Sequence, residues 1–382
     1  MPSGHAGYLD AVRRLERLGQ GIEPDMGRIE AMVGLLDHPE RAFPAIHVTG
    51  TNGKSSTVRM AGGILAAHGL RTGMYSSPHL QSVRERFTVA ELASKDDEAT
   101  VLAELITPED FAATWSYLRP FVEMVELERD QSLTYFELTT AMAFEWLVQQ
   151  AVSAAVVEVG MGGSWDATNV LDGQVAVVTH VAVDHVQYLG ETPADIAREK
   201  AGILRPGAPA VSAEQDPAVL ALLEARVAET GGELALLGRD FGVASNKLAL
   251  SGRALRIRGT RGTYDELFVP MHGAHQGSNA AVAVAASEAF LDRALDPDAV
   301  RLGLSTAALP GRMEVVSRKP LVVLDGCHNA DGARRLGPAL REAFGTRPTT
   351  MVISVFADKD AEGILGWLLP WADAAVFTPA SS

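Results

Sequence analysis

The fold of this chain is decided by the stretch Ile46-His47-Val48-Thr49-Gly50-Thr51-Asn52-Gly53-Lys54-Ser55-Ser56-Thr57. An apolar run typical of a β-strand breaks into a glycine-rich turn, and a helix follows with Lys54 near its start. Backbone N–H groups at such a turn and at a helix start can donate to an anion, and the Lys54 ammonium adds a full positive charge. The stretch therefore predicts a triphosphate-binding turn. A hydroxyl of Ser55, Ser56 or Thr57 would lie within reach of a phosphate or its Mg²⁺.

The match to the usual phosphate-loop pattern is imperfect at one position. The pattern G-x-x-x-x-G-K-[ST] requires glycine at position 48, where this sequence has Val48. An ordinary strand–turn–helix connection without a ligand is the alternative interpretation, and this stretch alone leaves it open.

Composition limits the class of protein. The chain has 382 residues, of which 47% are hydrophobic and 21% charged, so it is not largely disordered, and its length favours two domains. The formal net charge, 33 − 48 = −15, argues against a nucleic-acid or anionic membrane surface. Cys327 is the only cysteine, which excludes an internal disulfide and a Cys-based zinc site and suits a reducing cytoplasm. We expect no signal peptide, because residues 1–20 mix charged with apolar residues and have no continuous apolar region, and no membrane span, because no run of ~18 apolar residues occurs.

The order of apolar patterns predicts an α/β fold with a mostly parallel sheet. A strand, a helix and a second strand are expected at 43–48, 58–67 and 70–76, and two further strands buried on both faces at 154–160 and 175–181. Other helices are expected at 8–15, 26–36, 135–149, 220–230 and 280–290, and antiparallel strands within 248–269. We interpret residues 84–130, which are more polar, as connection and surface.

A second α/β unit is predicted after Pro310. A strand at 321–326, a helix and another strand at 350–355 repeat the earlier pattern there. We therefore expect a P-loop-type ATPase domain over residues 1–309 and a smaller Rossmann-like domain over residues 310–382. About 70 residues are few for a doubly wound domain, so the second domain is expected to be short of strands and truncated.

Polar side chains stand where the predicted parallel strands end. Glu158 closes one apolar strand, and Asp184-His185 follow the next. Ligands of open α/β sheets bind at this edge, so the coincidence of Lys54, Glu158 and His185 predicts a Mg²⁺ or Mn²⁺ site there. Taken singly, Glu158 is also readily explained as a cap of the next element, and His185 as a structural histidine.

Three further features bear on chemistry. Composition alone predicts Lys200 to be a surface lysine with its ammonium in water. Arg312 lies at the domain boundary, where a guanidinium can clamp a phosphate across a cleft. The segment Asp325-Gly326-Cys327-His328-Asn329 repeats the design of a strand followed by a polar turn. Two α/β domains with a triphosphate between them suggest phosphoryl transfer by domain closure.

Together these motifs resemble the folylpolyglutamate synthase/dihydrofolate synthase family, a branch of the Mur ligase superfamily. The motifs run in order from about residue 45 to 360: Gly50-Thr51-Asn52-Gly53-Lys54, Ser77-Pro78-His79-Leu80, Leu133-Thr134-Tyr135-Phe136-Glu137, Glu158-Val159-Gly160-Met161-Gly162-Gly163, Asp166-Ala167-Thr168-Asn169, Asp184-His185, Glu199-Lys200-Ala201-Gly202-Ile203, His275-Gln276, Asn279, Pro310-Gly311-Arg312 and Asp325-Gly326-Cys327-His328-Asn329. One motif would carry little information, whereas the series in register is specific.

The resemblance implies an ATP-dependent amide ligase. The γ-phosphoryl group of ATP would convert the carboxylate of dihydropteroate or a reduced folate into an acyl phosphate, which the amine of L-glutamate then attacks. The resemblance assigns catalysis to Lys54, Glu158, His185 and a carbamylated Lys200. It assigns ATP binding to residues 50–57, Gln276, Asn279, Arg312, Asp325 and His328, the Mg²⁺ to Ser77, Glu158 and His185, and the pterin site to Thr134, Phe136, Asp166 and Ala167.

The sequence departs from the family pattern in places. Ser55 stands where the family usually has glycine, Ser164-Trp165 replaces Arg-Leu, and Cys327 replaces alanine. Family members usually continue beyond residue 382, so glutamate binding or stability is expected to suffer. One alternative is a related Mur-type ligase with another acceptor, although the expected absence of an N-terminal UDP-binding domain argues against cell-wall substrates. The other alternative is an inactive nucleotide-binding remnant. We expect a cytoplasmic monomer whose partners are small molecules, with no nucleic acid and no membrane.

Overall fold

The computed structural model describes residues 4–18, 24–95 and 98–380. Its centre is an eight-stranded sheet with the order β4-β3-β2-β5-β1-β6-β7-β8. The strands are β1 (Ala45–Thr49), β2 (Thr72–Tyr75), β3 (Phe87–Lys95), β4 (Glu98–Leu105), β5 (Ala154–Glu158), β6 (Val175–Val178), β7 (Ala210–Ser212) and β8 (Leu234–Leu236). The six strands from β2 to β8 in this order pair in parallel, which confirms the predicted mostly parallel sheet.

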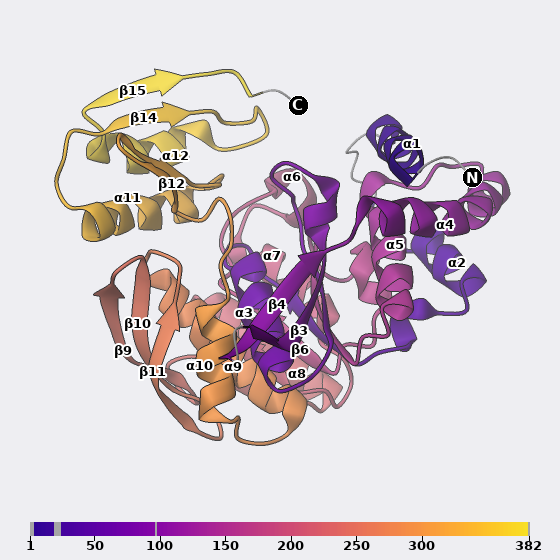
Figure 1. Cartoon of the computed structure of the whole chain (residues 1–382), viewed down its shortest axis with the longest axis horizontal. Helices are drawn as coiled ribbons and strands as arrows, with labels where there is room; N and C mark the ends of the chain where they lie inside the picture. Colours follow the sequence, from indigo (N-terminus) through magenta and orange to yellow (C-terminus); the bar gives the residue numbers. More distant parts are fainter. Residues whose placement is uncertain (1–3, 19–23, 96–97, 381–382) are drawn as a thin grey trace.

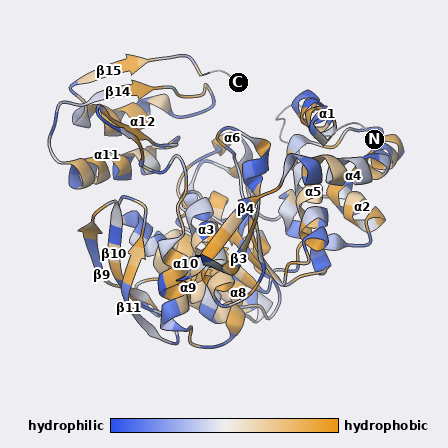
Figure 2. Ribbon diagram, in the orientation of Figure 1, coloured by the Kyte–Doolittle hydropathy of each residue, from blue (hydrophilic) through white to orange (hydrophobic). Residues whose placement is uncertain are grey.

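Alternate residues of the central strands face two different helical layers. Val156 and Val177 belong to the hydrophobic core shared with α3 (Lys54–Ala67), α9 (His275–Leu291) and α10 (Pro297–Ser305). Val157 packs on the other face with α2 (Gly27–Leu35), α4 (Pro108–Arg129) and α5 (Tyr135–Gln149), and Val178 with α7 (Pro193–Lys200) and α8 (Pro217–Thr230). Helices therefore cover both faces, as near-continuous apolar strands require. Figure 1 shows these layers, with α1 (Gly4–Arg17) packed on α4, and α9 and α10 are largely apolar in Figure 2.

The interpretation of residues 84–130 as connection and surface is wrong. β3 and β4 form a hairpin, and β3 extends the sheet by pairing antiparallel with β2. Helix α4 then packs against the hydrophobic core that contains Val157 and the helices α2 and α5. The segment looks polar because the hairpin is the edge of the sheet: the start of β3 is buried, whereas its far end and most of β4 are exposed. An antiparallel edge with a solvated face carries polar side chains that a buried parallel strand does not.

A buried ion pair ties two of the helices on this side of the sheet. Arg28 of α2 donates from Nε to both carboxylate oxygens of Glu137 on α5, at 3.1 and 3.0 Å, and both side chains are at most 5% exposed. Removing Glu137 takes from the buried Arg28 guanidinium the carboxylate that it bonds through Nε, while Asp25, whose carboxylate lies 3.8 Å from Arg28 Nη1, remains. We expect Glu137→Ala to lower the free energy of unfolding by about 3–5 kcal/mol in urea titrations. The matched variant Glu145→Ala removes an exposed hydrogen bond on α5 and should cost less than about 1 kcal/mol; an equal loss would contradict the account.

The chain then adds an antiparallel sheet beside the central unit, made of β9 (Gly242–Ala249), β10 (Gly252–Arg258) and β11 (Thr263–Val269). After α10 it enters a separate region, residues 314–380, which we call the C-terminal lobe (Figure 1). The lobe contains the hairpin β12 (Glu314–Arg318) and β13 (Leu321–Leu324), α11 (Ala330–Phe344), the parallel pair β14 (Thr350–Ile353) and β15 (Ala374–Phe377), and α12 (Ala361–Leu368). Ala333, Ile364 and Leu368 form its own small core. We propose the domain boundary at residues 309/310, between α10 and β12.

Within the described residues, no helix is both long enough and apolar enough to cross a membrane. The short helices are α6 (Val186–Leu189), η1 (Pro39–Arg41), η2 (Val83–Arg86), η3 (Ala167–Val170), η4 (Ala201–Ile203) and η5 (Leu369–Trp371).

Candidate active site at the carboxyl edge of the central sheet

The glycines of the turn after β1 are required by its shape. Gly50 has φ +138°, and a Cβ there would lie 1.9 Å from the Thr179 hydroxyl oxygen. Gly53 has φ +96°, and its Cβ would lie 2.5 Å from Oδ1 of Asn279. Val48 is a fully buried residue of β1, paired with neighbouring strands, so the position that departs from the usual pattern needs no glycine. The turn is therefore a tight glycine-dependent one, and Asn279 lies directly against it.

The donors of this turn differ in part from the expectation. The N–H groups of Thr51 and Asn52 both donate to the carbonyl of His180, at 2.9 and 3.2 Å, so they do not face outward. Helix α3 begins at Lys54, and the N–H groups of its first turn have no carbonyl one turn earlier to receive them, apart from Thr57, which donates to Gly53. The anion-binding end of the turn is therefore the start of α3.

The side chains of the turn are already arranged around it. Lys54 Nζ donates to the carbonyls of Gly50 and Thr51, at 3.1 and 3.4 Å, which holds the ammonium over the turn. The Thr57 hydroxyl donates to the Gly53 carbonyl at 2.9 Å, and Ser56 is buried. The positive charge and the free N–H groups thus meet at one point, which suits a phosphate.

Glu158 lies beside this turn because β5 is the neighbour of β1. Its carboxylate is 1% exposed and accepts from the Ser55 hydroxyl at 3.0 Å and from the Ser77 N–H at 3.2 Å. Burial raises the pKa of Glu158, and the Lys54 ammonium and the Ser55 hydroxyl oppose that rise. These contacts bring two of the predicted residues, Ser55 and Ser77, to the carboxylate of a third, Glu158.

His185 lies at the end of the next strand region, on the other side of β1. Its burial, with Lys359 and Lys54 nearby, lowers the pKa of His185 to about 4, so the ring is neutral at pH 7. Asp184 beside it is buried too, but the hydrogen bond from His328, followed by the hydrogen bond and charge of Lys359, holds its pKa well below the usual range.

The donor set fits a divalent cation. Glu158 supplies a carboxylate, Ser77 a hydroxyl and His185 a neutral imidazole. Among the described residues no group of three or more His, Cys, Asp or Glu side chains is arranged to hold a metal ion by itself. Mg²⁺ is commonly bound by one or two carboxylates together with substrate phosphates, so a site of this composition suits an ion that arrives with a nucleotide.

Lys200 is not the surface lysine that composition predicts. It ends α7 and is 3% exposed. The turn at Gly163 packs on the backbone there: a Cβ on Gly163 would lie 2.5 Å from the carbonyl oxygen of Glu199 and 2.8 Å from that of Lys200. Burial, followed by the charge of Lys54, lowers the pKa of Lys200 to about 7. A large share of this amine is therefore neutral at physiological pH.

The lowered pKa of Lys200 predicts that the stability of the protein depends on pH. The pKa of Lys200 is about 7 in the folded chain and its ordinary value is 10.5, so between these values the unfolded chain binds a proton that the folded chain does not. The free energy of unfolding should then rise with pH, by up to about 1.4 kcal/mol per pH unit. The destabilisation caused by burying Lys200 is fully present only below about pH 7. We expect Lys200→Met to lack this rise in urea titrations between about pH 7.5 and 9.5 in bicarbonate-free buffer. If the free energy of unfolding depended on pH with the same slope in the wild type and in Lys200→Met, the lowered pKa of Lys200 would be contradicted.

The predicted pterin-site residues gather on the α5 side of the sheet. Thr134 caps α5 by accepting from the N–H of Glu137 at 3.2 Å. Phe136 faces the glycine turn after β5, since a Cβ on Gly160 would lie 2.5 Å from its Cζ atom. Asp166 is 2% exposed and accepts from the Met161 N–H at 2.8 Å, and burial raises its pKa to about 6. Ala167 follows it as the first residue of η3.

The remaining predicted residues come from α9 and the C-terminal side. Gln276 is buried and accepts from Asn279 Nδ2 at 3.0 Å. Asp325 accepts from the N–H groups of Met313 and Cys327, both at 2.9 Å. Arg312 lies next to the turn after β13, where a Cβ on Gly326 would be 2.6 Å from its Nη1. His328 Nε2 is 3.4 Å from Asp184 Oδ2, so the turn of the C-terminal lobe reaches the edge of the central sheet.

Sequence reasoning missed Asp331 and Lys359 at this edge of the sheet and gave Asn329 no role of its own. Asn52 of the turn exchanges hydrogen bonds with Asn329 at 3.1 Å and also donates to Asp331. Asp184 was named with His185 at the end of a predicted strand, and Asn329 only as part of a motif. For Asp331 and Lys359 a single sequence offers no signal, because their partners lie far away along the chain.

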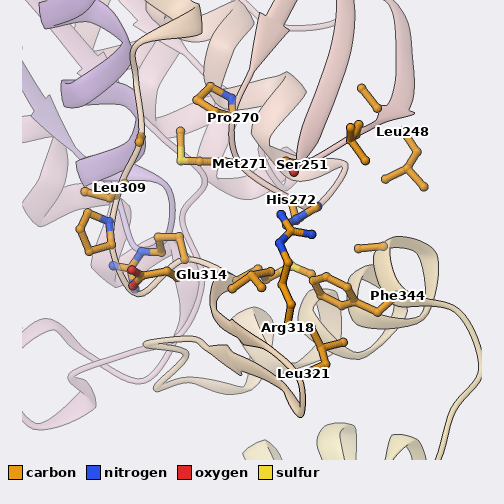
Figure 3. Close-up of a pocket in the computed structure, with 18 of the residues that line it drawn as sticks. Leu248, Ser251, Pro270, Met271, His272, Leu309, Glu314, Arg318, Leu321 and Phe344 are labelled. Carbon is orange, nitrogen blue, oxygen red and sulfur yellow. The ribbon is translucent and has the colours of Figure 1, made fainter.

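A cavity of about 770 Å³ opens between the antiparallel sheet and the C-terminal lobe. Figure 3 shows Arg318 and Phe344 of the lobe near His272, which precedes α9. The rings of His272 and Phe344 are 5.0 Å apart. Arg312 also lines this cavity, so the seam between the two parts of the chain continues to the candidate site.

Comparison with known proteins agrees with this arrangement. Residues 48–287 match the model of the Mur ligase middle domain. The chain is 39% identical over 374 residues to the dihydrofolate synthase/folylpolyglutamate synthase of Mycobacterium tuberculosis, covering 94% of this chain and 74% of that protein. It belongs to the dihydrofolate synthase/folylpolyglutamate synthase family. The family resemblance found in the sequence is thereby confirmed.

Solved structures of the family superimpose on the whole fold. The Mycobacterium tuberculosis folylpolyglutamate synthase complexed with ADP has a TM-score of 0.91 at 38% identity, and the alignment covers 100% of this chain and 83% of that one. An FPGS–AMPPCP–folate complex has a TM-score of 0.89 at 33% identity, with 98% and 89% covered. The two-part α/β architecture is therefore that of the family.

Proposed function

We propose that this chain is an ATP-dependent ligase that joins L-glutamate to dihydropteroate, to a reduced folate, or to both, through an acyl phosphate. The observation that carries the proposal is the meeting of Lys54, Glu158 and His185 at the ends of three adjacent strand regions, in a chain of this family. Buried Lys200 and the C-terminal lobe border the same edge. The alternatives, a ligase for another acceptor and an inactive remnant, are favoured by no specific contact.

The reaction follows from the charges at this edge. A substrate carboxylate oxygen attacks the γ-phosphorus of ATP, the bond to the bridging oxygen breaks, and ADP leaves. The amine of glutamate then attacks the acyl carbon of the mixed anhydride, and the tetrahedral intermediate expels phosphate as the amide forms and the amine loses its proton. A bound Mg²⁺ would neutralise charge on the phosphate oxygens. Lys54 and the start of α3 stabilise the same charge, because they are fixed donors that need no rearrangement.

We assign Gln276, Asn279, Arg312, Asp325 and His328 to the nucleotide, and Ser77, Glu158 and His185 to the Mg²⁺. Asn279 supports this assignment because it lies against Gly53 of the turn. Thr134, Phe136, Asp166 and Ala167 are assigned to the pterin. Phe136 offers an aromatic face beside the glycine turn after β5, and Asp166, with a pKa near 6, offers a carboxyl group that can accept or donate a hydrogen bond.

Lys200 is proposed to carry a carbamate. Only the neutral form of a lysine amine attacks CO₂, forming the N–C bond and releasing one proton, and a pKa near 7 makes that form abundant. The new carboxylate would lie near Lys54, whose charge stabilises it. In ¹³C-bicarbonate buffer, the wild type should show a carbamate carbon signal that Lys200→Ala lacks. Equal spectra would remove the carbamate from the proposal.

We further propose that the protein works as a cytoplasmic monomer on small molecules. The single cysteine suits a reducing compartment, and the net charge of −15 disfavours nucleic acid and anionic lipid as partners.

Acceptor-dependent ADP release tests the proposed function. The wild type is assayed with ATP, Mg²⁺ and glutamate, together with dihydropteroate, tetrahydrofolate or 5,10-methylenetetrahydrofolate. We expect release with at least one of these acceptors and none when glutamate or the acceptor is left out. Turnover only with an unrelated acid would favour the other Mur-type ligase. Binding of ATP without turnover with any acceptor would favour the remnant.

A further inference from the structure

The C-terminal lobe contacts the edge of the central sheet at Asp184. Oδ1 of this carboxylate accepts from Lys359 Nζ at 2.8 Å, and Oδ2 accepts from Asn329 Nδ2 at 3.2 Å. His328 Nε2 lies 3.4 Å from Oδ2. All three partners belong to the C-terminal lobe, and the Asp184 side chain is 8% exposed. Asp184 is therefore one of the points of the central unit on which the lobe rests, together with Asn52, which bonds Asn329 and Asp331, and Arg253, which pairs with Glu342 at 2.7 Å.

Lys359 lies beside Asp184 because of the conformation of a short loop, residues 356–360. The Lys359 side chain is 9% exposed, whereas its neighbours from Phe356 to Asp360 are all exposed. The loop is held by a hydrogen bond from the Lys359 N–H to the Phe356 carbonyl, at 3.1 Å, and by Asp360, which caps α12. A lysine normally keeps its ammonium in water, so its burial here depends on the carboxylate that it meets across the interface.

Lys359 also contacts His185. Its Nζ lies 3.3 Å from Nε2 and 3.5 Å from Nδ1 of the ring, so it touches the imidazole without a directed bond to one nitrogen alone. The N–H of His185 donates to Asp184 Oδ1 at 2.9 Å, and its backbone is left-handed, with φ +52°. The position of the ring therefore depends on Asp184 and on Lys359.

We propose that Lys359 is a positioning residue that holds the C-terminal lobe closed by docking on Asp184 and thereby fixes His185 for the ligase reaction. The inference rests on the proposed function of this edge. The ion pair exists only while the lobe is against the sheet, so it shifts the balance between open and closed arrangements toward the closed one. Asn329, which bonds both Asp184 and Asn52, extends the effect of closure to the phosphate-binding turn.

Hydrogen exchange measures this effect without turnover. Peptides covering residues 50–57 and 184–189 are followed in the wild type and in Lys359→Met, with Mg²⁺ and AMPPCP. We expect exchange at least about tenfold faster in Lys359→Met, because loss of the pair favours the open arrangement. Lys359→Arg should restore most of the protection. The matched control is Lys319→Met, which changes an exposed lysine of the same lobe and should behave as the wild type.

Kinetics separate positioning from general stability. We expect Lys359→Met to lower kcat about 10²-fold and to raise KM for ATP by a clearly smaller factor, since the phosphate-binding turn belongs to the central unit whereas Asp325 and His328, also assigned to the nucleotide, belong to the lobe. The double variant Asp184→Asn/Lys359→Met should be no slower than the slower single variant, because both act through one contact. The inference would be overturned if the loss of kcat in the double variant equalled the product of the losses in the two single variants. It would also be overturned if Lys359→Met showed the hydrogen exchange and kcat of the wild type. If the wild type turns over no acceptor, the proposed function fails, and the exchange experiment still decides whether Lys359 closes the lobe.

Discussion

Lys54→Met is expected to lower kcat for acceptor-dependent ADP release by about 10²–10³-fold. Lys54 provides the fixed positive charge above the turn, held there by the carbonyls of Gly50 and Thr51. Methionine keeps the length of the side chain and removes the charge, so the turn retains its shape while the γ-phosphoryl group loses its principal protein cation. ADP release at saturating ATP measures the loss directly.

The fold should survive this change, because Lys54 is only half-buried and, within the part of the chain that the structure describes, forms no ion pair that would be left broken. Thermal unfolding of Lys54→Met is expected to match the wild type within a few degrees. Lys95→Met is the matched control, since Lys95 lies exposed at the end of β3, and it should keep full activity. A kcat of Lys54→Met within tenfold of the wild type would remove Lys54 from the phosphoryl-transfer site.

Glu158→Gln is expected to lower kcat by a similar factor, about 10²–10³-fold, and to raise the Mg²⁺ concentration needed for half-maximal rate. Glutamine has nearly the same shape and can still accept from the Ser77 N–H, but it lacks the negative charge that a divalent ion requires. Because burial raises the pKa of Glu158, removing the charge should leave the free energy of unfolding unchanged or higher. Loss of activity with retained stability therefore distinguishes a ligand from a structural carboxylate.

Binding of Mn²⁺ in the presence of AMPPCP, followed by electron paramagnetic resonance, gives a second readout for Glu158→Gln. We expect markedly weaker Mn²⁺ binding than in the wild type. Glu104→Gln changes an exposed carboxylate of β4 and serves as the control. Unchanged Mn²⁺ affinity in Glu158→Gln would place the cation elsewhere.

The parts of the site that follow from local sequence pattern were predictable. Gly50, Gly53 and Lys54 are adjacent in the chain, and the strands that carry Glu158 and precede His185 are continuous apolar runs whose carboxyl ends share an edge. Helix α5 was predicted with the bounds that the structure has, Tyr135–Gln149, because its apolar spacing is a local signal; in the structure Thr134 and Glu137 form a capping box at its start.

The remaining features depend on contacts that the local pattern does not contain. Lys200 looks exposed in sequence, and its burial comes from the Gly163 turn, 37 residues earlier. The β3–β4 hairpin looks like surface because its outer face is surface. Lys359 meets Asp184 across 175 residues, and only the docking of the C-terminal lobe on the sheet brings the two together. The environment of such residues can be known only from the three-dimensional structure.

In the proposed reaction, ATP activates the substrate carboxylate by phosphorylating it. The most direct test supplies the acceptor with ¹⁸O in its reacting carboxylate and measures the isotope in the phosphate released during amide formation. The proposed mechanism predicts one ¹⁸O atom in each phosphate, because the carboxylate oxygen that attacks the γ-phosphorus leaves with it. Phosphate without ¹⁸O, formed at the same rate as the amide, would contradict the acyl phosphate.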